Sequence, residues 1–128
     1  INQTAGPCTD MLLYESAVGL MSVSVSSASV SIGPRSASGK YTDHVSPLET
    51  KFCAEVFKAC AGMKRKDANE VAKALIPKYE DNLMTPPKGK KFQECFDLKT
   101  LKPTTEWRDI YDRVNKEISD LGIPVELP

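Results

Sequence analysis

The sequence has 128 residues, which is enough chain for one domain with an ordinary core. Seventeen acidic and 17 basic side chains cancel, so no overall field favours nucleic acid or an anionic membrane as a partner. No apolar run reaches the roughly 20 residues of a bilayer span, and the first residues lack the pattern of a signal peptide. We therefore expect a cytoplasmic protein that binds neither nucleic acid nor a membrane.

The chain contains four cysteines and one histidine. No two cysteines form a C-x-x-C pair, so no zinc-site pattern is present and we expect no bound metal. Without a signal peptide, all four cysteines are expected to be reduced and mostly buried. They are Cys8, Cys53, Cys60 and Cys95.

The charged residues divide the chain into two regions. Residues 1–46 contain three acidic and two basic side chains, and residues 47–128 contain the other 14 acidic and 15 basic ones. The first region is typical of chain that is covered on several sides, whereas the second is typical of helices with a solvated face.

The first predicted helix covers about residues 9–21, directly after the Gly6-Pro7 turn. Thr9 can cap it. Apolar residues recur at helical spacing, and further apolar residues fill much of the opposite side, so we expect burial on more than one face. The spaced residues are Met11, Tyr14, Val18 and Met21.

A strand is predicted at residues 28–32, where serine alternates with β-branched residues, and Gly33-Pro34 ends it. The loop RSASGKYTDHV follows. Because one strand cannot form a sheet, its partners must come from another chain or from sequence outside these residues.

Ser46-Pro47-Leu48-Glu49 predicts a helix start, with Ser46 as N-cap and Glu49 completing a capping box. Gly62 is expected to end this helix. The next predicted helix covers about residues 66–83, with a kink at Pro77.

Residues 84–103 form a long connector with its own apolar side chains, which we expect to wrap over a surface. The last helix is predicted to start near Thr104 or Thr105 and to end at Gly122. Two i,i+4 ion pairs are expected on its solvent side: Asp109 with Arg113, and Asp112 with Lys116.

Three features could carry chemistry, and each has a simpler interpretation. Cys8 at a helix start could have a lowered thiol pKa, but small filler in a tight turn is favoured. His44 beside Asp43 could be a general base, although a structural histidine is favoured. Lysines 88, 90 and 91 could hold a phosphate, but without a glycine-rich loop a solvated patch is favoured. No catalytic set is complete.

Four stretches together resemble the C-terminal region of monomethylamine methyltransferases. They are AGPCTDMLLYESA, SASGKYTD, PLETKF with AEVFKACAGM, and KGKKFQECFDLKTLKPT. The similarity runs through nearly the whole chain, whereas the family's chain is several times longer. These methanogen enzymes pass a methyl group from monomethylamine to a corrinoid protein.

The resemblance implies a fold that is mainly α with one or two short strands, namely the last βα part of a (β/α)₈ barrel plus C-terminal helices. Residues 1–46 would end the barrel, and residues 47–128 would cover it and support contacts in a homo-oligomer. Within the first part, residues 1–7 would follow the seventh strand, 8–27 would be a helix, 28–33 the eighth strand and 34–45 its loop.

The family's reaction implies an encoded pyrrolysine that holds the methylamine, and a methyl transfer to Co(I) of a corrinoid on a separate partner protein. The pyrrolysine lies upstream of the matched region, so we expect this segment to be inactive alone, with no catalytic residue, metal or cofactor of its own. Active sites of such barrels lie on the βα loops. The resemblance thus implies a pocket rim, where the corrinoid protein docks, that includes Asn2, Gln3, Cys8, Gly33, Ser36, Asp43 and His44.

One stretch departs from the family. Ile1-Asn2-Gln3-Thr4 stands where the family has tyrosines, one of them near the substrate, which leaves open another amine or another methyl acceptor. The alternative to an enzyme segment is an independent helical interaction or regulatory module. A reading frame that continues upstream through an in-frame amber codon favours the enzyme, and a start codon just before Ile1 favours the module.

Overall fold

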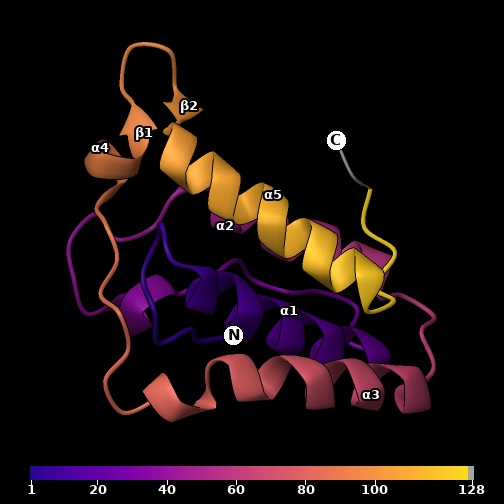
Figure 1. The fold of residues 1–128 in the computed structure, drawn as a ribbon. Helices are drawn as coiled ribbons and strands as arrows, with labels where there is room; N and C mark the ends of the chain where they lie inside the picture. The colour runs from indigo at the N-terminus through magenta and orange to yellow at the C-terminus, as the bar shows by residue number, and fades with distance from the viewer. Residues whose placement is uncertain (127–128) are drawn as a thin grey trace.

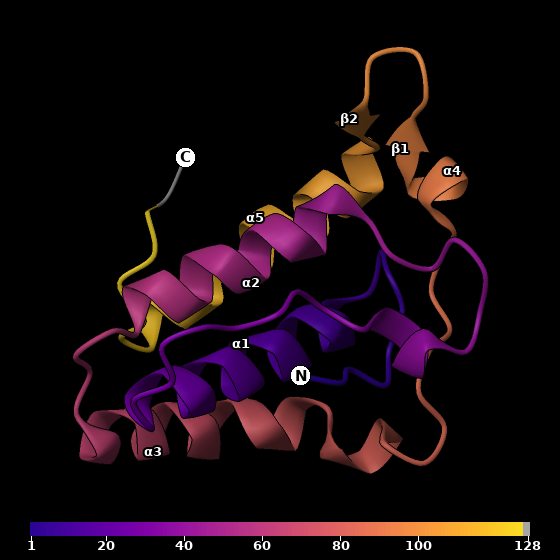
Figure 2. The same cartoon turned by 180° about the vertical axis from the view of Figure 1, so that it is seen from behind.

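The computed structural model describes residues 1–126 and is mainly helical, as predicted. Its longer helices are α1 (Asp10–Val25), α2 (Pro47–Ala59), α3 (Arg65–Leu75) and α5 (Thr105–Asp120). Helix α1 lies between α3 on one side and the pair of α2 and α5 on the other (Figures 1 and 2). The short helix α4 (Phe92–Cys95) and a small β-hairpin lie together at one end.

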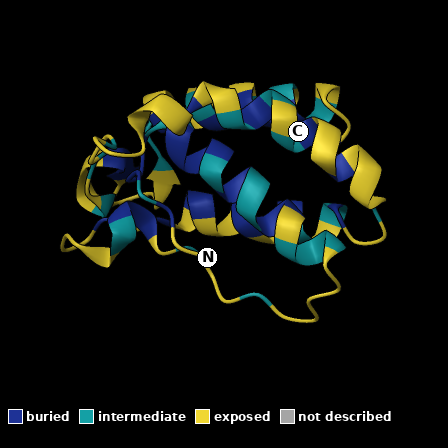
Figure 3. Cartoon of the chain, turned by 90° about the horizontal axis from the view of Figure 1, so that it is seen from below, coloured by how far each residue is buried: buried dark blue, intermediate teal, exposed yellow. Residues whose placement is uncertain are grey.

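Helix α1 forms the centre of the core. Thr9 caps it, because its Oγ1 accepts a hydrogen bond from the Leu12 N–H at 3.3 Å. Four consecutive residues, 11–14, are buried, since α2, α3 and α5 all contact this helix. The burial pattern in Figure 3 and these contacts confirm the predicted burial on more than one face.

The predicted strand at residues 28–32 is wrong for this chain. The segment has no regular secondary structure, and the side chains of Val30 and Ile32 are 79% and 87% exposed. A strand needs a neighbour for its backbone hydrogen bonds. Within residues 1–126, the pairing nearest this segment is one parallel bridge between Asn2 and Arg35, three residues beyond its end.

The starts and ends of α2 and α3 follow local sequence signals. Glu49 accepts a hydrogen bond from the Ser46 N–H at 2.5 Å, which is the glutamate half of the predicted capping box. Gly62 follows α2 with a left-handed φ of 81°. Helix α3 ends at Leu75, and 3₁₀ turns η2 (Ile76–Lys78) and η3 (Glu80–Asn82) replace the predicted kinked helix around Pro77.

The connector contains structure that the sequence did not reveal. Strand β1 (Phe96–Asp97) pairs antiparallel with β2 (Lys102–Pro103). The Asp97 carboxylate accepts hydrogen bonds from the N–H groups of Lys99 at 2.8 Å and Thr100 at 3.0 Å. This turn sits directly before α5, which starts at Thr105 as predicted. Thr104 caps the helix by accepting from the Trp107 N–H at 3.4 Å.

The ion pairs of α5 differ from those expected. The structure pairs Arg108 with Asp112, Arg113 with Glu117, and Lys116 with Asp120. Arg113 turns towards α1, where it also reaches the Tyr14 hydroxyl at 3.3 Å and Asp10 at 3.3 Å. Contacts with another helix therefore decide its partners, and the expected pairs with Asp109 and between Asp112 and Lys116 are wrong.

The cysteines behave as predicted, because all four are buried and unpaired. Burial is the main cause that raises the pKa of Cys60 to about 11 and of Cys95 to about 12. Both are therefore inert, protonated thiols at neutral pH. They belong to one continuous core that residues 1–46 and 47–126 share.

Candidate functional site

The two segments that the resemblance places at a pocket rim, residues 1–8 and 33–45, lie beside each other, and we call them the paired loops. They meet at the parallel bridge between Asn2 and Arg35. Two backbone hydrogen bonds follow, from the Ser38 N–H to the Gln3 carbonyl at 2.8 Å and from the Ala37 N–H to the Ala5 carbonyl at 2.7 Å. Residues more than 30 positions apart in sequence thus form one continuous structure.

The backbone of the paired loops is strained. Cys8, Ala37, Ser38 and Asp43 all have left-handed φ angles between 51° and 64°. With Gly39 at 66°, residues 37–39 form three left-handed residues in a row. The left-handed conformation costs roughly 1–2 kcal/mol for each residue with a Cβ, and such strain gathers at functional sites when the surroundings hold it in place. We call residues 37–39 the left-handed turn.

Gln3 connects the paired loops to the helices. Its side chain is 1% exposed. Nε2 donates to Ser16 Oγ of α1 at 2.9 Å and lies 3.7 Å from Cys53 Sγ of α2, while Oε1 accepts from the Arg35 N–H at 2.9 Å. The amide therefore faces the protein interior and uses both of its ends.

A buried carboxylate lies directly behind the left-handed turn. Glu49 of α2 is 0% exposed, and its Oε1 accepts from Ser36 Oγ at 3.0 Å as well as from the Ser46 N–H. Its Oε2 accepts from the Ser46 hydroxyl, which in turn accepts from Trp107 Nε1 at 3.0 Å. Burial raises the pKa of Glu49, and the hydrogen bonds oppose that shift only in part.

Residues 85–93, which we call the strap, cross over both paired loops. Gly6 and Gly89 meet backbone to backbone: a Cβ on Gly89 would lie 2.3 Å from the Pro7 carbonyl oxygen. The Gly6 N–H donates to the Pro87 carbonyl at 3.0 Å, and the Lys90 N–H donates to the Pro7 carbonyl at 2.8 Å. The strap can therefore approach this closely only because Gly6 and Gly89 have no side chains.

The far end of the strap binds the second paired loop through Asp43. The Phe92 N–H donates to the Asp43 carbonyl at 2.8 Å, and Gln93 Nε2 donates to the Asp43 carboxylate at 2.8 Å. Lys88 places its ammonium 4.4 Å from the ring centre of Tyr41. Three separate contacts therefore keep the strap on residues 41–43.

His44 is buried and structurally engaged. Its Nδ1 lies 2.8 Å from the Thr42 carbonyl, so Nδ1 carries a proton. The ring is 5.3 Å from that of Tyr41. A cavity of about 220 Å³ lies next to it, lined by Arg35, Tyr41, Asp43 and His44 among others. These polar residues all come from one loop, and the Asp43 carboxylate already accepts a hydrogen bond from Gln93 of the strap.

The remaining predicted rim residues lie in different surroundings. Asn2 is exposed at the bridge, whereas Ser36 is buried against Glu49. Gly33 is exposed and closest to Thr50 of α2. Cys8 is buried, and burial with the nearby Glu106 carboxylate raises the pKa of its thiol to about 11, which excludes a ready thiolate nucleophile.

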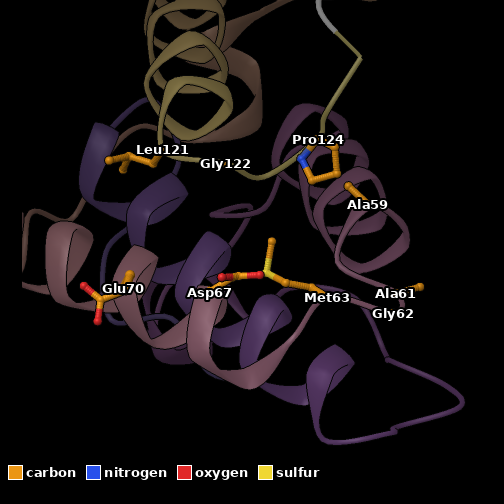
Figure 4. Close-up of a pocket in the computed structure, with 9 residues that line it drawn as sticks. All are labelled: Ala59, Ala61, Gly62, Met63, Asp67, Glu70, Leu121, Gly122 and Pro124. Carbon is orange, nitrogen blue, oxygen red and sulfur yellow. The ribbon is translucent and has the colours of Figure 1, made fainter.

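A larger cavity of about 540 Å³ lies between the ends of α2 and α5 and the start of α3 (Figure 4). Asp67 and Glu70 are its charged lining residues, and Met63 and Leu121 contribute apolar surface. None of the predicted rim residues lines it. Its two carboxylates come from one helix face without a base or nucleophile beside them.

Two further observations limit the chemistry of the described residues. Among residues 1–126, no three His, Cys, Asp or Glu side chains gather closely enough to hold a metal ion. In the same range, no helix is long and apolar enough to cross a membrane. Two of the three lysines of the strap have partners of their own, because Lys90 pairs with Glu106 at 2.5 Å and Lys88 lies over Tyr41.

Sequence reasoning missed the buried position of Glu49. The capping box explains its bond to Ser46, but Ser36 lies 13 residues earlier, and no local pattern links the two. The connector that contains the strap was expected to cover a surface, but the sequence did not predict that the strap would pack against Gly6. The Gly-Pro and Pro-Pro-Lys-Gly stretches are the only signals that could have indicated a close backbone approach there.

The paired loops, the strap and the helical core together form one mainly helical segment. A protein-family model described as "Monomethylamine methyltransferase MtmB" matches residues 2–123. This chain therefore belongs to the monomethylamine methyltransferase MtmB family.

Known members of the family are clearly similar over nearly the whole chain. The protein from Methanosarcina mazei is 42% identical over 119 residues, and MtmB1 of Methanosarcina barkeri is 38% identical over the same length. In both cases the match covers 93% of this chain but 26% of the relative. The chain thus spans about a quarter of the length of these relatives.

Solved structures agree with this assignment. The crystal structure of the Methanosarcina barkeri monomethylamine methyltransferase superimposes with a TM-score of 0.89 at 37% identity, covering 94% of this chain and 26% of that one. The crystal structure of a hydroxylamine complex of MtmB gives the same values. The arrangement of helices described above is therefore that of a segment of this enzyme.

Proposed function

We propose that this chain is part of an enzyme that transfers the methyl group of monomethylamine to Co(I) of a corrinoid protein. The observation that carries the proposal is the family match over residues 2–123, with 42% identity to a named monomethylamine methyltransferase. In this reaction the methyl carbon exchanges its bond to nitrogen for a bond to cobalt. The electron pair of the new bond comes from Co(I), and the protonated nitrogen leaves as ammonia with the former C–N pair.

The paired loops support a place for residues 1–46 at the end of a (β/α)₈ barrel. Asn2 and Arg35 pair in parallel, so the chain before Ile1 runs beside residues 28–34 if the pairing continues in the same register. That neighbour would give residues 28–34 the hydrogen-bond partner that they lack among residues 1–126. In a barrel, the layer packed on that face of the sheet would then cover Val30 and Ile32, which are largely exposed here.

In this proposal the paired loops lie at the mouth of the barrel and face the corrinoid protein, which carries the cofactor. The residues that hold the amine belong to the rest of the enzyme, and the segment is inactive alone. Its helices α3 and α5 then form the outer layer, where contacts between copies in a homo-oligomer can form.

The test compares the intact protein that contains this sequence with residues 1–128 alone. Each is mixed with monomethylamine and a corrinoid protein reduced to Co(I), and methylation of the cobalt is followed by its visible absorbance. We expect methylation by the intact protein and none by residues 1–128. Absence of methylation by the intact, folded protein would refute the enzyme assignment and favour the independent binding module.

A further inference from the structure

We propose that Glu49 is a positioning residue of this enzyme: its buried carboxylate holds the left-handed turn in the shape that the corrinoid-protein docking surface requires. The inference rests on the proposed function for the docking role. The role in holding the turn rests on the geometry of residues 35–49 and the groups that bond them.

The left-handed turn is fixed from two sides. On one side, the carbonyl groups of Gln3 and Ala5 accept the N–H groups of Ser38 and Ala37. On the other side, the residue before the turn, Ser36, donates its hydroxyl to Glu49 at 3.0 Å. The bonds to Ala37 and Ser38 use backbone atoms only. Glu49 is the side chain that attaches the adjacent Ser36 to α2, while the Gln3 side chain holds the Arg35 N–H one position earlier.

Glu49 is well suited to hold a fixed geometry. It is 0% exposed and lies within the first turn of α2, whose rigid backbone fixes its position. Its two oxygens accept from Ser36 and from both the N–H and the hydroxyl of Ser46. Trp107 donates to the same Ser46 hydroxyl, so the chain of hydrogen bonds ends on α5.

A buried carboxylate is an expensive way to anchor a loop, because taking the charge out of water is unfavourable. The helix start alone does not need it, since an exposed glutamate can close a capping box equally well. The additional bond from Ser36 directs this charge at the strained residues of the paired loops. Strained backbone of this kind persists only when its surroundings over-determine it.

The experiment uses the intact methyltransferase with three variants. Glu49→Met keeps the length of the side chain and removes both acceptors, whereas Glu49→Gln keeps one acceptor. Glu55→Met is the matched control, because Glu55 lies on the same helix and its carboxylate accepts from the Tyr111 hydroxyl at 2.5 Å, away from the turn.

For Glu49→Met we expect faster hydrogen exchange at residues 36–40. We also expect the KM for the corrinoid protein to rise about tenfold, which corresponds to a loss of roughly 1.4 kcal/mol in the free energy of docking. The KM for monomethylamine should stay unchanged. Glu49→Gln should restore most of the affinity for the corrinoid protein, and Glu55→Met should change neither KM. A role only in folding predicts instead a lower kcat in proportion to the folded fraction.

The outcomes separate this inference from the proposed function. Unchanged exchange at residues 36–40 in Glu49→Met would overturn the positioning role, whatever the enzyme's activity. Faster exchange with an unchanged KM for the corrinoid protein would overturn the docking role. Failure of the unmodified enzyme to methylate the corrinoid protein would refute the proposed function and with it the docking role. Hydrogen exchange at residues 36–40 would still decide whether Glu49 holds the turn.

Discussion

Replacing Gly89 by alanine is expected to release the strap from the Gly6-Pro7 turn. Gly89 has a left-handed φ of 74°, and an added Cβ would lie 2.3 Å from the Pro7 carbonyl oxygen and 2.5 Å from the Gly6 carbonyl carbon. These are backbone atoms, so no side chain can turn aside to make room. The strap must therefore move away from the turn.

The cost can be worked out from the contacts that this movement breaks. The left-handed backbone alone costs an alanine roughly 1–2 kcal/mol. The two hydrogen bonds, from Gly6 to Pro87 and from Lys90 to Pro7, contribute about 1 kcal/mol each. We expect a loss of about 3–4 kcal/mol in the free energy of unfolding, measured by urea denaturation.

Gly62→Ala is the matched control. Gly62 also has a left-handed φ, at 81°, but no atom lies within 4 Å of an added Cβ. This variant should therefore lose only the backbone part, roughly 1–2 kcal/mol. Equal losses in Gly89→Ala and Gly62→Ala would show that the strap is not held against the turn, and the reasoning from the close approach would be refuted.

A double-mutant cycle sharpens the result. A Cβ on Gly6 would lie 1.7 Å from the Lys88 carbonyl oxygen, so Gly6→Ala should release the same strap. Once the strap has moved, the second substitution meets little further resistance, and the double variant should lose much less than the sum of the two single losses. Additive losses would mean that the two glycines act independently.

Three further predictions concern burial and charge. Burial raises the pKa of Glu49 above its usual 4.5, so the folded protein holds this proton more tightly than the unfolded chain does. The free energy of unfolding should therefore fall as pH rises from 4.5 through the raised pKa. Denaturation curves taken across pH should show this fall in the unmodified protein and not in Glu49→Gln. The thiol pKa of Cys8 is raised to about 11, so at neutral pH Cys8 should react with iodoacetamide far more slowly in the folded protein than in urea. Equal reaction rates would contradict its burial. Residues 1–128 alone should self-associate or bind a hydrophobic dye through Val30 and Ile32. Replacing both residues with lysine should reduce self-association, measured by light scattering, and dye binding, measured by fluorescence. A monomer that binds no dye would contradict the expectation.

Local signals predicted the helices well because the interactions behind them are local. Thr9, Ser46 and Thr104 each precede a helix as expected, and Gly62 follows one. A cap needs only the three or four residues next to it. The starts of α1, α2 and α5 could therefore be predicted without any knowledge of the tertiary fold.

Features that depend on distant residues could not be predicted in this way. Residues 28–32 alternate like a strand, but their pairing requires a neighbour that the described chain does not provide. Arg113 takes partners on α1, about 100 positions earlier, in place of the one that helix spacing suggested. The hairpin was missed because its strands are two residues long and its left-handed position is Leu101, with no glycine to indicate a turn.

The candidate site shows the same division. The resemblance placed residues 1–8 and 33–45 in one region, and they lie beside each other in the structure. That Gln3 and Ser36 turn inwards, and that Glu49 lies behind the turn, followed from no pattern in the sequence. These positions are decided by which backbone and side-chain groups need partners once the helices have packed.

The central position of α1 has a consequence for biosynthesis. This helix leaves the ribosome well before α5, which packs on it; Tyr14 of α1 and its hydrogen-bond partner Glu117 of α5, 2.7 Å apart, are separated by 103 positions in sequence. At about 5–20 residues per second, the ribosome needs on the order of 5–20 s to make that stretch. During this time the part of the α1 surface that α5 covers stays exposed, so the nascent chain is expected to bind chaperones that recognise apolar helices.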